Sequence, residues 1–144
     1  AGLERAQVVA AYDELPEKAK ELASKHGARA FEGLDALLAD KAVQAVVVAS
    51  PQFAHAANTV AAAKAGKHVF IEKPMAASVQ ECVGLMQEAQ RRGLHLMVGH
   101  TFLYSPVIQK IKEVVDYGDI GELRYIAARR LNLGSGFFVP PKPA

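Results

Sequence analysis

The apolar run VQAVVVA, at residues 43–49, limits the possible folds of this chain more than any other stretch. Near-continuous apolar character over a short, valine-rich run is typical of a strand buried on both faces, as in a parallel sheet. Stretches with helical spacing lie before and after it. Strands that alternate with helices at this spacing are expected to be parallel and joined by right-handed crossovers. The sequence therefore predicts an α/β fold.

Turn and capping residues place the other elements. Pro16 suits the first position of a helix and Gly27 its C-terminal cap. Ser78 and Glu81 have the spacing of a capping box that opens a later helix. Further strands are predicted at residues 7–12, 28–31, 68–71, 95–98 and from Leu123 onward, and further helices around Leu34, at 53–65 and at 106–117. The tail, residues 134–144, is rich in glycine and proline and is predicted to be a loop.

Composition and charge exclude several classes of protein. Of the 144 residues 51% are hydrophobic and 22% are charged, which is typical of a globular domain. The 17 basic and 15 acidic residues are scattered, so a nucleic-acid partner is not expected. The longest apolar stretch, residues 42–49, is too short to cross a membrane. Cys82 is the only cysteine, which favours a reducing compartment and hence the cytoplasm.

Open α/β sheets bind ligands beyond the carboxyl ends of their strands. The candidate site residues at predicted strand ends are Asp13, Ser50, Pro51, Glu72, Lys73, Pro74, Gly99 and His100. Tyr104 follows the last of these strands and is either a substrate contact or a domain-interface residue. No spacing of histidine, cysteine or carboxylate residues suggests a metal site.

Asp13 ends the first predicted strand. An acid at this place can accept the ribose hydroxyls of a dinucleotide, which favours NAD, or it can be an ordinary turn aspartate. Lys18 and Lys20 nearby leave NADP open. The phosphate-binding G-x-G-x-x-G motif should lie roughly 20 residues before Asp13, which would be before residue 1. The chain is therefore expected to lack the phosphate-binding loop.

The tripeptide Glu72-Lys73-Pro74 directly follows a predicted buried strand. A lysine at a strand end can hydrogen-bond a substrate hydroxyl and take part in acid–base chemistry. Glu72 would hold the lysine or contact the cofactor, and Pro74 would fix the turn. The alternative is a surface turn with a solvated ion pair. His55, in the first turn of the next predicted helix, lies either near a dinucleotide or in solvent, and its position alone favours solvent.

These motifs, taken in order, resemble the Gfo/Idh/MocA oxidoreductases, the group of glucose–fructose oxidoreductase and inositol dehydrogenase. The similar segments are AYD at 11–13 and the stretches at 43–76, 93–115 and 120–126. The resemblance implies a Rossmann-type doubly wound parallel sheet that lacks its first βα unit. It also implies the first strand of a C-terminal α/β domain, with a Rossmann domain at residues 1–119 and the second domain starting at 120–144.

The resemblance also implies an activity, namely NAD(P)-dependent hydride transfer on a hydroxyl of a sugar, nucleotide-sugar or cyclitol by a homo-oligomer. Lys73 would be catalytic and would contact the sugar hydroxyl. The residues implied to bind the cofactor are Asp13, Ser50, Pro51, His55, Glu72, Lys73 and Pro74. The residues implied to contact the substrate are His100, Tyr104, Arg130 and Asn132.

The resemblance is incomplete, and it leaves alternatives open. Without the central first strand, the strand before Asp13 would lose its main neighbour, and this chain alone is expected to be inactive. A redox-neutral epimerase, isomerase or glycosidase of the same family would use the same residues. A non-catalytic binding module built on a truncated fold is a second alternative. A flavodoxin-like domain would leave the placement of Glu72-Lys73-Pro74 unexplained.

Overall fold

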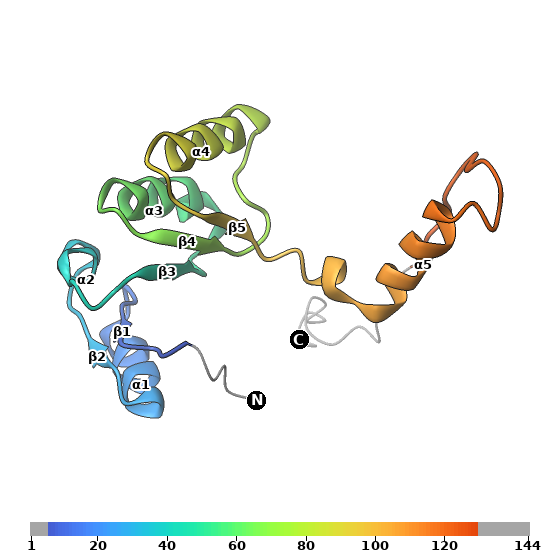
Figure 1. Ribbon diagram of the computed structural model, residues 1–144. Helices are drawn as coiled ribbons and strands as arrows, with labels where there is room; N and C mark the ends of the chain where they lie inside the picture. Colours follow the sequence, from blue (N-terminus) through green and yellow to red (C-terminus); the bar gives the residue numbers. More distant parts are fainter. Residues whose placement is uncertain (1–5, 130–144) are drawn as a thin grey trace, which may run out of the picture. The chain divides into compact units, whose positions relative to one another are not determined.

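The computed structural model describes residues 6–129 (Figure 1). The chain divides after Thr101 into two compact units. The first unit contains, in order, β1 (Ala10–Ala11), α1 (Pro16–His26), β2 (Arg29–Ala30), α2 (Leu34–Ala39), β3 (Ala45–Val48), α3 (Gln52–Lys64), β4 (His68–Ile71), α4 (Val79–Arg91) and β5 (Leu96–Val98). A 3-10 helix, η1 (Thr101–Tyr104), precedes α5 (Pro106–Asp116) of the second unit.

The capping residues act as their local chemistry predicts. Pro16 opens α1, and Gly27 ends it in the left-handed region at φ 64°. At the start of α4 the Ser78 side chain accepts from the Glu81 amide, and the Glu81 side chain accepts from the Ser78 amide. This capping box satisfies two backbone donors at the helix start. Both helix starts are therefore confirmed.

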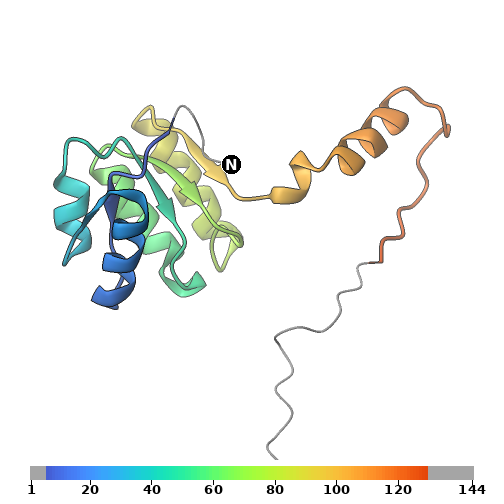
Figure 2. The same cartoon turned by 90° about the horizontal axis from the view of Figure 1, so that it is seen from below.

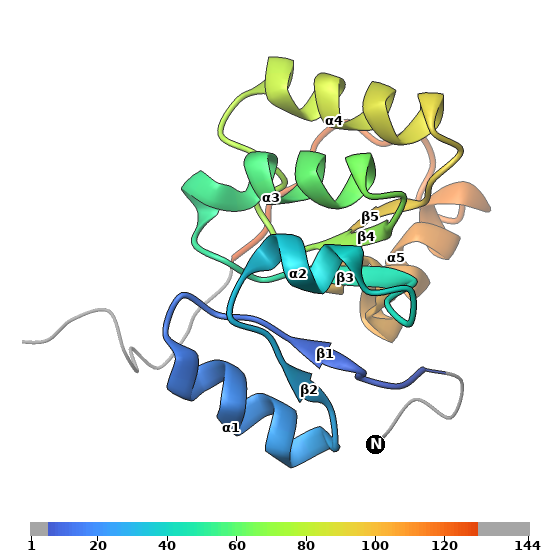
Figure 3. The ribbon, with the colours of Figure 1, turned by 90° about the vertical axis from the view of Figure 1, so that its left-hand side faces the viewer.

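The strands of the first unit are parallel, as predicted, but they form two separate ladders. The larger sheet has the order β3-β4-β5, with Val48, Ile71 and Val98 in one cross-strand row. The smaller one pairs β1 with β2. Figure 3 shows the two ladders apart from each other. Among residues 6–129, therefore, β1 and β3 each have a hydrogen-bonding partner on one side only. Strand β1 is also shorter than the predicted 7–12.

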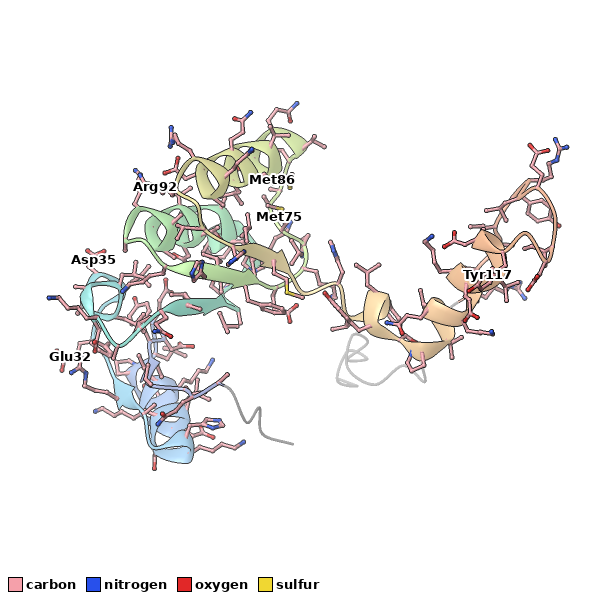
Figure 4. All side chains as sticks on the ribbon, in the orientation of Figure 1. Glu32, Asp35, Met75, Met86, Arg92 and Tyr117 are labelled. Atoms are coloured by element: carbon pink, nitrogen blue, oxygen red, sulfur yellow. The ribbon has the colours of Figure 1, made fainter. Side chains whose placement is uncertain are left out.

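The core lies between the larger sheet and its helices. The buried cluster is Leu37, Leu38, Val43, Val48, Ala62, Val69 and Ile71. Met75, labelled in Figure 4, packs against this cluster after the turn that follows β4. Figures 1 and 2 show α3 and α4 on the same side of the sheet. Burial of this apolar cluster stabilises the fold.

The opposite face of the larger sheet is bare, which corrects the expectation that the run at 43–49 is buried on both faces. Val47, Phe70 and Met97 form one cross-strand row on this face. Val47 is 69% exposed and Met97 43%. A strand is buried on both faces only where helices cover both. In the described part of the first unit, α3 packs against one face of β3, and α3 and α4 lie on the same side of the sheet.

Lys67 is buried between α3 and β4 and fixes the loop before β3. Its ammonium donates to the Asp40 carbonyl at 2.8 Å and to the Val43 carbonyl at 2.7 Å. Asp40 is the C-terminal cap of α2, and Val43 leads into β3. Charge-assisted hydrogen bonds of this kind are stronger than neutral ones, so one side chain ties the end of a helix to the start of a strand.

We expect Lys67→Met to destabilise the fold by about 2 kcal/mol, because it keeps the aliphatic stem and leaves both carbonyls without their donor. Urea unfolding measures this difference. Lys41→Met is the matched control, since Lys41 is exposed in the same loop, and it should stay within about 0.5 kcal/mol of the parent. Equal stability of the Lys67 variant and the parent would show that water replaces the ammonium.

The second unit is described up to residue 129. Helix α5 buries none of its side chains, and the labelled Tyr117 at its end is 75% exposed (Figure 4). The strand predicted from Leu123 onward is wrong over residues 123–129, where the backbone forms no strand. A strand needs a neighbour for its backbone donors and acceptors, and no strand in the described part of this unit supplies one. Within residues 6–129 no helix is long and apolar enough to span a membrane.

Candidate functional site

The carboxyl ends of β3, β4 and β5 meet at one edge of the larger sheet. Val48, Ile71 and Val98 are aligned, so the residues that follow them are neighbours. The Glu72 amide donates to the Val48 carbonyl, and the Gly99 amide donates to the Ile71 carbonyl, each at 2.9 Å. The structure therefore brings together three of the predicted strand-end segments, those that begin with Ser50, Glu72 and Gly99.

The Glu72 carboxylate lies against Gly99. A side-chain carbon built on Gly99 would be 3.4 Å from Glu72 Oε1 and 3.3 Å from Cζ of Phe70. Gly99 is itself buried, so glycine leaves the space that the carboxylate and the ring occupy. The other oxygen, Oε2, accepts the Lys73 backbone amide at 3.1 Å. Glu72 is thus half-buried and fixed at the ends of two strands.

Gly99→Ala should therefore destabilise the fold by about 1 kcal/mol, because the added methyl group forces Phe70 or Glu72 to shift. Gly84→Ala is the matched control. Gly84 lies inside α4, and a side-chain carbon there would meet nothing within 4 Å. Alanine favours a helix more than glycine, so this control should be stabilised by roughly 0.5–1 kcal/mol. Chemical unfolding measures whether each variant gains or loses unfolding free energy. A gain for Gly99→Ala as well as for Gly84→Ala would refute the tight packing at Gly99.

Lys73 is exposed, and its ammonium is free. Within residues 6–129 it forms neither a hydrogen bond nor an ion pair, and Glu72 contacts the Lys73 backbone instead of its head. The alternative of a surface ion pair between these two side chains is therefore wrong. A fixed carboxylate beside an unpartnered cation, at the edge of a parallel sheet, leaves three donor hydrogens for a ligand.

Ser50 and His55 join the loop after β3 to the loop after β4. His55 Nε2 is 2.8 Å from the Ser50 carbonyl oxygen, and Nδ1 is 2.8 Å from the Pro74 carbonyl oxygen. The ring is 2% exposed, so the solvent-exposed histidine favoured by its position alone is wrong. The physical reason is that α3 begins at Gln52 and turns His55 onto its buried side. Contact with a cofactor stays a prediction.

Asn58 was missed by the sequence reasoning. Its side-chain amide donates to Ser50 Oγ at 3.1 Å. Asn58 lies three residues after His55, a spacing that places two side chains on one side of a helix. That spacing was the available signal, but it points to Ser50 only once the turn between β3 and α3 is known.

Asp13 forms a local turn. Its Oδ1 accepts the Leu15 amide at 2.9 Å, two residues on, and the side chain is exposed. This is the behaviour of an ordinary turn aspartate. The other carboxylate oxygen has no hydrogen-bond donor among residues 6–129. Binding of a ribose by Asp13 therefore stays a prediction.

The remaining predicted site residues are less informative. Pro51 is exposed at the start of α3, Pro74 is exposed, and the His100 side chain is exposed after β5. Tyr104 belongs to the second unit, where it is exposed. Arg130 and Asn132 lie outside the described residues. Within residues 6–129 no three side chains of histidine, cysteine, aspartate or glutamate gather as a metal site.

Known proteins are similar in sequence to this chain. The model of an oxidoreductase family with an NAD-binding Rossmann fold matches residues 1–100. A dTDP-3,4-didehydro-2,6-dideoxy-alpha-D-glucose 3-reductase from Streptomyces violaceoruber is 37% identical over 128 residues, which are 89% of this chain and 35% of that protein. A 2,7-anhydro-N-acetylneuraminate hydratase from Escherichia coli (strain K12) is 33% identical over 120 residues, 83% of this chain and 32% of that protein.

A solved structure shows the same similarity in three dimensions. The crystal structure of a 3-ketoreductase from Actinomadura kijaniata, in complex with NADP and TDP-benzene, matches with a TM-score of 0.77 and 34% sequence identity. The match covers 83% of this chain and 37% of that one. The chain thus spans about a third of the length of the curated relatives it matches.

Proposed function

Because this chain belongs to the Gfo/Idh/MocA oxidoreductase family with the NAD-binding Rossmann fold, we propose that it is the cofactor-binding part of an enzyme that transfers hydride. The cofactor is NAD or NADP, and the substrate is a hydroxyl-bearing sugar, nucleotide-sugar or cyclitol. The observation that carries this proposal is the unpartnered Lys73 ammonium at the edge where β3, β4 and β5 end. Ligands of open α/β sheets bind at this edge.

The residues present fit one part of a dinucleotide. The Lys73 ammonium and the Ser50 hydroxyl can still donate hydrogen bonds at the sheet edge. Because residue 99 is glycine, the Glu72 carboxylate can lie against the end of β5. The residues that would contact the ribose and nicotinamide portions are Asp13, Ser50, Pro51, Glu72, Lys73 and Pro74, and the buried His55 would support Ser50 and Pro74 from behind. Residues 1–144 contain no G-x-G-x-x-G motif, so they offer no such loop to the pyrophosphate.

When bound, the nicotinamide supplies the hydride acceptor or donor, and the protein supplies orientation and electrostatics. Lys73 Nζ would hydrogen-bond the oxygen of the substrate carbon that is oxidised or reduced. As that carbon loses hydride, the proton of its hydroxyl would pass to the Lys73 amine, and in the reverse direction the Lys73 ammonium would return a proton to the oxygen. Ser50 and Glu72 would hold the nicotinamide ring in place beside the reacting carbon of the substrate. His100, Tyr104, Arg130 and Asn132 remain proposed substrate contacts.

The test is turnover by the protein that carries this chain, assayed with NAD⁺ and with NADP⁺ against a panel of nucleotide-sugars, free sugars and inositols. The proposal expects one mole of reduced cofactor for each mole of ketone formed. Failure to bind either dinucleotide would overturn it. Comparison of the two cofactors also decides between NAD and NADP, a choice for which Asp13 favours NAD.

A redox-neutral reaction is the second candidate. The observation that favours it is the similarity to the hydratase from Escherichia coli, which extends over 120 residues, against 128 for the reductase. The same Lys73 and the same cofactor would then act in a cycle that returns the hydride. Product formation without accumulation of reduced cofactor would select this candidate over net oxidation.

The proposal also covers the compartment, the domains and the oligomeric state of the enzyme. We place it in the cytoplasm, because the chain has a single cysteine and thus no internal disulfide. We propose a Rossmann domain up to residue 119, followed by a second domain that begins with Ile120, and a homo-oligomer with a sugar-like small molecule as its partner. Size-exclusion chromatography with light scattering measures the oligomeric state.

A further inference from the structure

We propose that His55 is a positioning residue that holds the loop after β3 and the loop after β4 in one arrangement and thereby places Lys73. The part that concerns catalysis by Lys73 rests on the proposed function. The part that concerns the two loops rests on the contacts of the ring alone. His55 acts through its neighbours in both parts and touches no ligand.

The first argument is the burial of the ring. Helix α3 turns His55, Thr59, Ala62 and Ala63 inward, while Phe53 is 85% exposed. The helix is otherwise rich in alanine, so His55 is the bulky polar group on an apolar face. Burial of a polar group is costly unless it is hydrogen-bonded. The carbonyl oxygens of Ser50 and Pro74, which face the two ring nitrogens, therefore reduce the cost of burying His55.

The second argument is the pair of contacts. Pro74 lies 19 residues from His55 along the chain and Ser50 five, and each carbonyl oxygen is 2.8 Å from a ring nitrogen. A neutral ring donates to one of the two oxygens, and a ring with both hydrogens donates to both. The ring is rigid and planar, so the distance between its nitrogens is constant. A single side chain thus fills the space between the two loops, with one ring nitrogen 2.8 Å from a carbonyl oxygen of each.

The third argument is the position of Pro74. It directly follows Lys73, and its ring restricts the backbone torsion φ. A contact that fixes the Pro74 carbonyl therefore also restricts where the Lys73 backbone lies. The Lys73 backbone amide donates to Glu72 Oε2 at 3.1 Å. The backbone at Lys73 and Pro74 is thus held by Glu72 on one side and by His55 on the other, while the Lys73 ammonium stays free.

The fourth argument is that α3 holds Ser50 twice. His55 contacts the Ser50 carbonyl, and the Asn58 amide donates to Ser50 Oγ. Because Oγ accepts this hydrogen bond, the hydroxyl hydrogen of Ser50 remains to be donated, and no acceptor among residues 6–129 receives it. Helix α3 thus contacts two atoms of Ser50 in the β3 loop, in addition to the Pro74 carbonyl in the β4 loop.

The variants that test the proposal are His55→Phe, which keeps a ring but has no donor, and His55→Gln, which keeps an amide donor. Thr59→Val is the matched control. Thr59 lies one turn further along the same buried face at 2% exposure, and its hydroxyl has no hydrogen-bond partner in the described structure. All three are made in the protein that carries this chain.

The first readout needs no activity. In ¹H–¹⁵N NMR spectra without cofactor, His55→Phe is expected to shift the amide signals of Ser50, Glu72, Lys73 and Met75. The Thr59→Val control should leave these signals in place. Unchanged signals in a folded His55→Phe protein would overturn the proposal. If His55→Phe does not fold, the comparison of His55→Gln with the parent carries the same test.

The second readout is kinetic. His55→Phe is expected to lower kcat by about 10–100-fold, because small misplacements of catalytic groups have effects of this size, with cofactor KM changed less than about 3-fold. His55→Gln should recover part of the loss. A weakened cofactor KM with unchanged kcat would instead mean direct contact and would overturn positioning. If the parent is inactive but the NMR shifts occur, the loop arrangement stands and the proposed function fails.

Discussion

Lys73→Ala is expected to lower kcat by about 10²–10⁴-fold, which is the usual contribution of a positioned acid–base group. The ammonium is exposed and unpartnered within residues 6–129, so its removal takes nothing from the packing of the fold. The loss of kcat would therefore reflect the chemistry of Lys73 and not a change in stability. Steady-state kinetics with a saturating dinucleotide measure the loss. Cofactor affinity, followed by quenching of protein or nicotinamide fluorescence, should change only a few-fold, because other residues bind most of the dinucleotide.

The matched control for this prediction is Lys64→Ala. Lys64 is an exposed lysine in the last turn of α3, and its removal should leave kcat unchanged. A kcat within about 3-fold of the parent for Lys73→Ala would contradict the assignment of Lys73 as catalytic. Equal losses for both variants would indicate a general effect of charge instead of chemistry at the sheet edge.

Ile71→Ala is expected to cost about 3–4 kcal/mol of unfolding free energy, within the range found for large-to-small changes in cores. Ile71 is completely buried, lies in the middle strand and pairs with Val48 and Val98. Truncation would leave a cavity between the sheet and α3. A loss of this size is a large part of the total stability of a typical domain, so the variant should unfold at a clearly lower urea concentration than the parent. Circular dichroism during urea unfolding measures it.

Val47→Ala provides the comparison on the other face of the sheet. Val47 is also a β-branched strand residue, and it pairs with Phe70 of β4, but it is 69% exposed. Its truncation should change stability by less than about 0.5–1 kcal/mol, because little buried area is lost. A loss as large as that of Ile71→Ala would show that something covers this face in solution.

The sequence predicts those parts of the fold that depend on short segments. The capping box of Ser78 and Glu81 and the αL glycine at Gly27 were correct because all their atoms lie within a few residues. The parallel direction of β3, β4 and β5 was also correct, since alternation with helices leaves few other topologies. The bare face at Val47 was not predictable, because it depends on which elements pack against β3.

The candidate site was predicted in its position but not in its contacts. The rule for open sheets selected Ser50, Glu72, Lys73 and Gly99, and the structure places them at one edge. The position of His55 in the first turn of a helix favoured solvent, and nothing near it in the sequence indicated its contact with Pro74, which is 19 residues away. The free state of the Lys73 head was equally hidden, since adjacent glutamate and lysine residues look like an ion pair until the backbone directs the carboxylate elsewhere.

Strand β1 and the segment after Leu123 show that strand propensity alone does not determine where a strand forms. Residues 7–12 contain β-favouring valines, yet the ladder of β1 covers only Ala10–Ala11. Residues 123–129 have a comparable character and form no strand. In both places the backbone needs a neighbour on the correct side, and strand propensity depends strongly on that context.

The two lysines with opposite surroundings, Lys67 and Lys73, should also differ in their covalent chemistry. The Lys67 amine is enclosed and occupied by two carbonyl oxygens, whereas the Lys73 amine is open to solvent. Acylating reagents should therefore modify Lys73 early and Lys67 only when the fold opens. The extent of labelling at Lys67 thus becomes a gauge of local opening, and protection of Lys73 by an added nucleotide would report binding in a preparation that catalyses nothing.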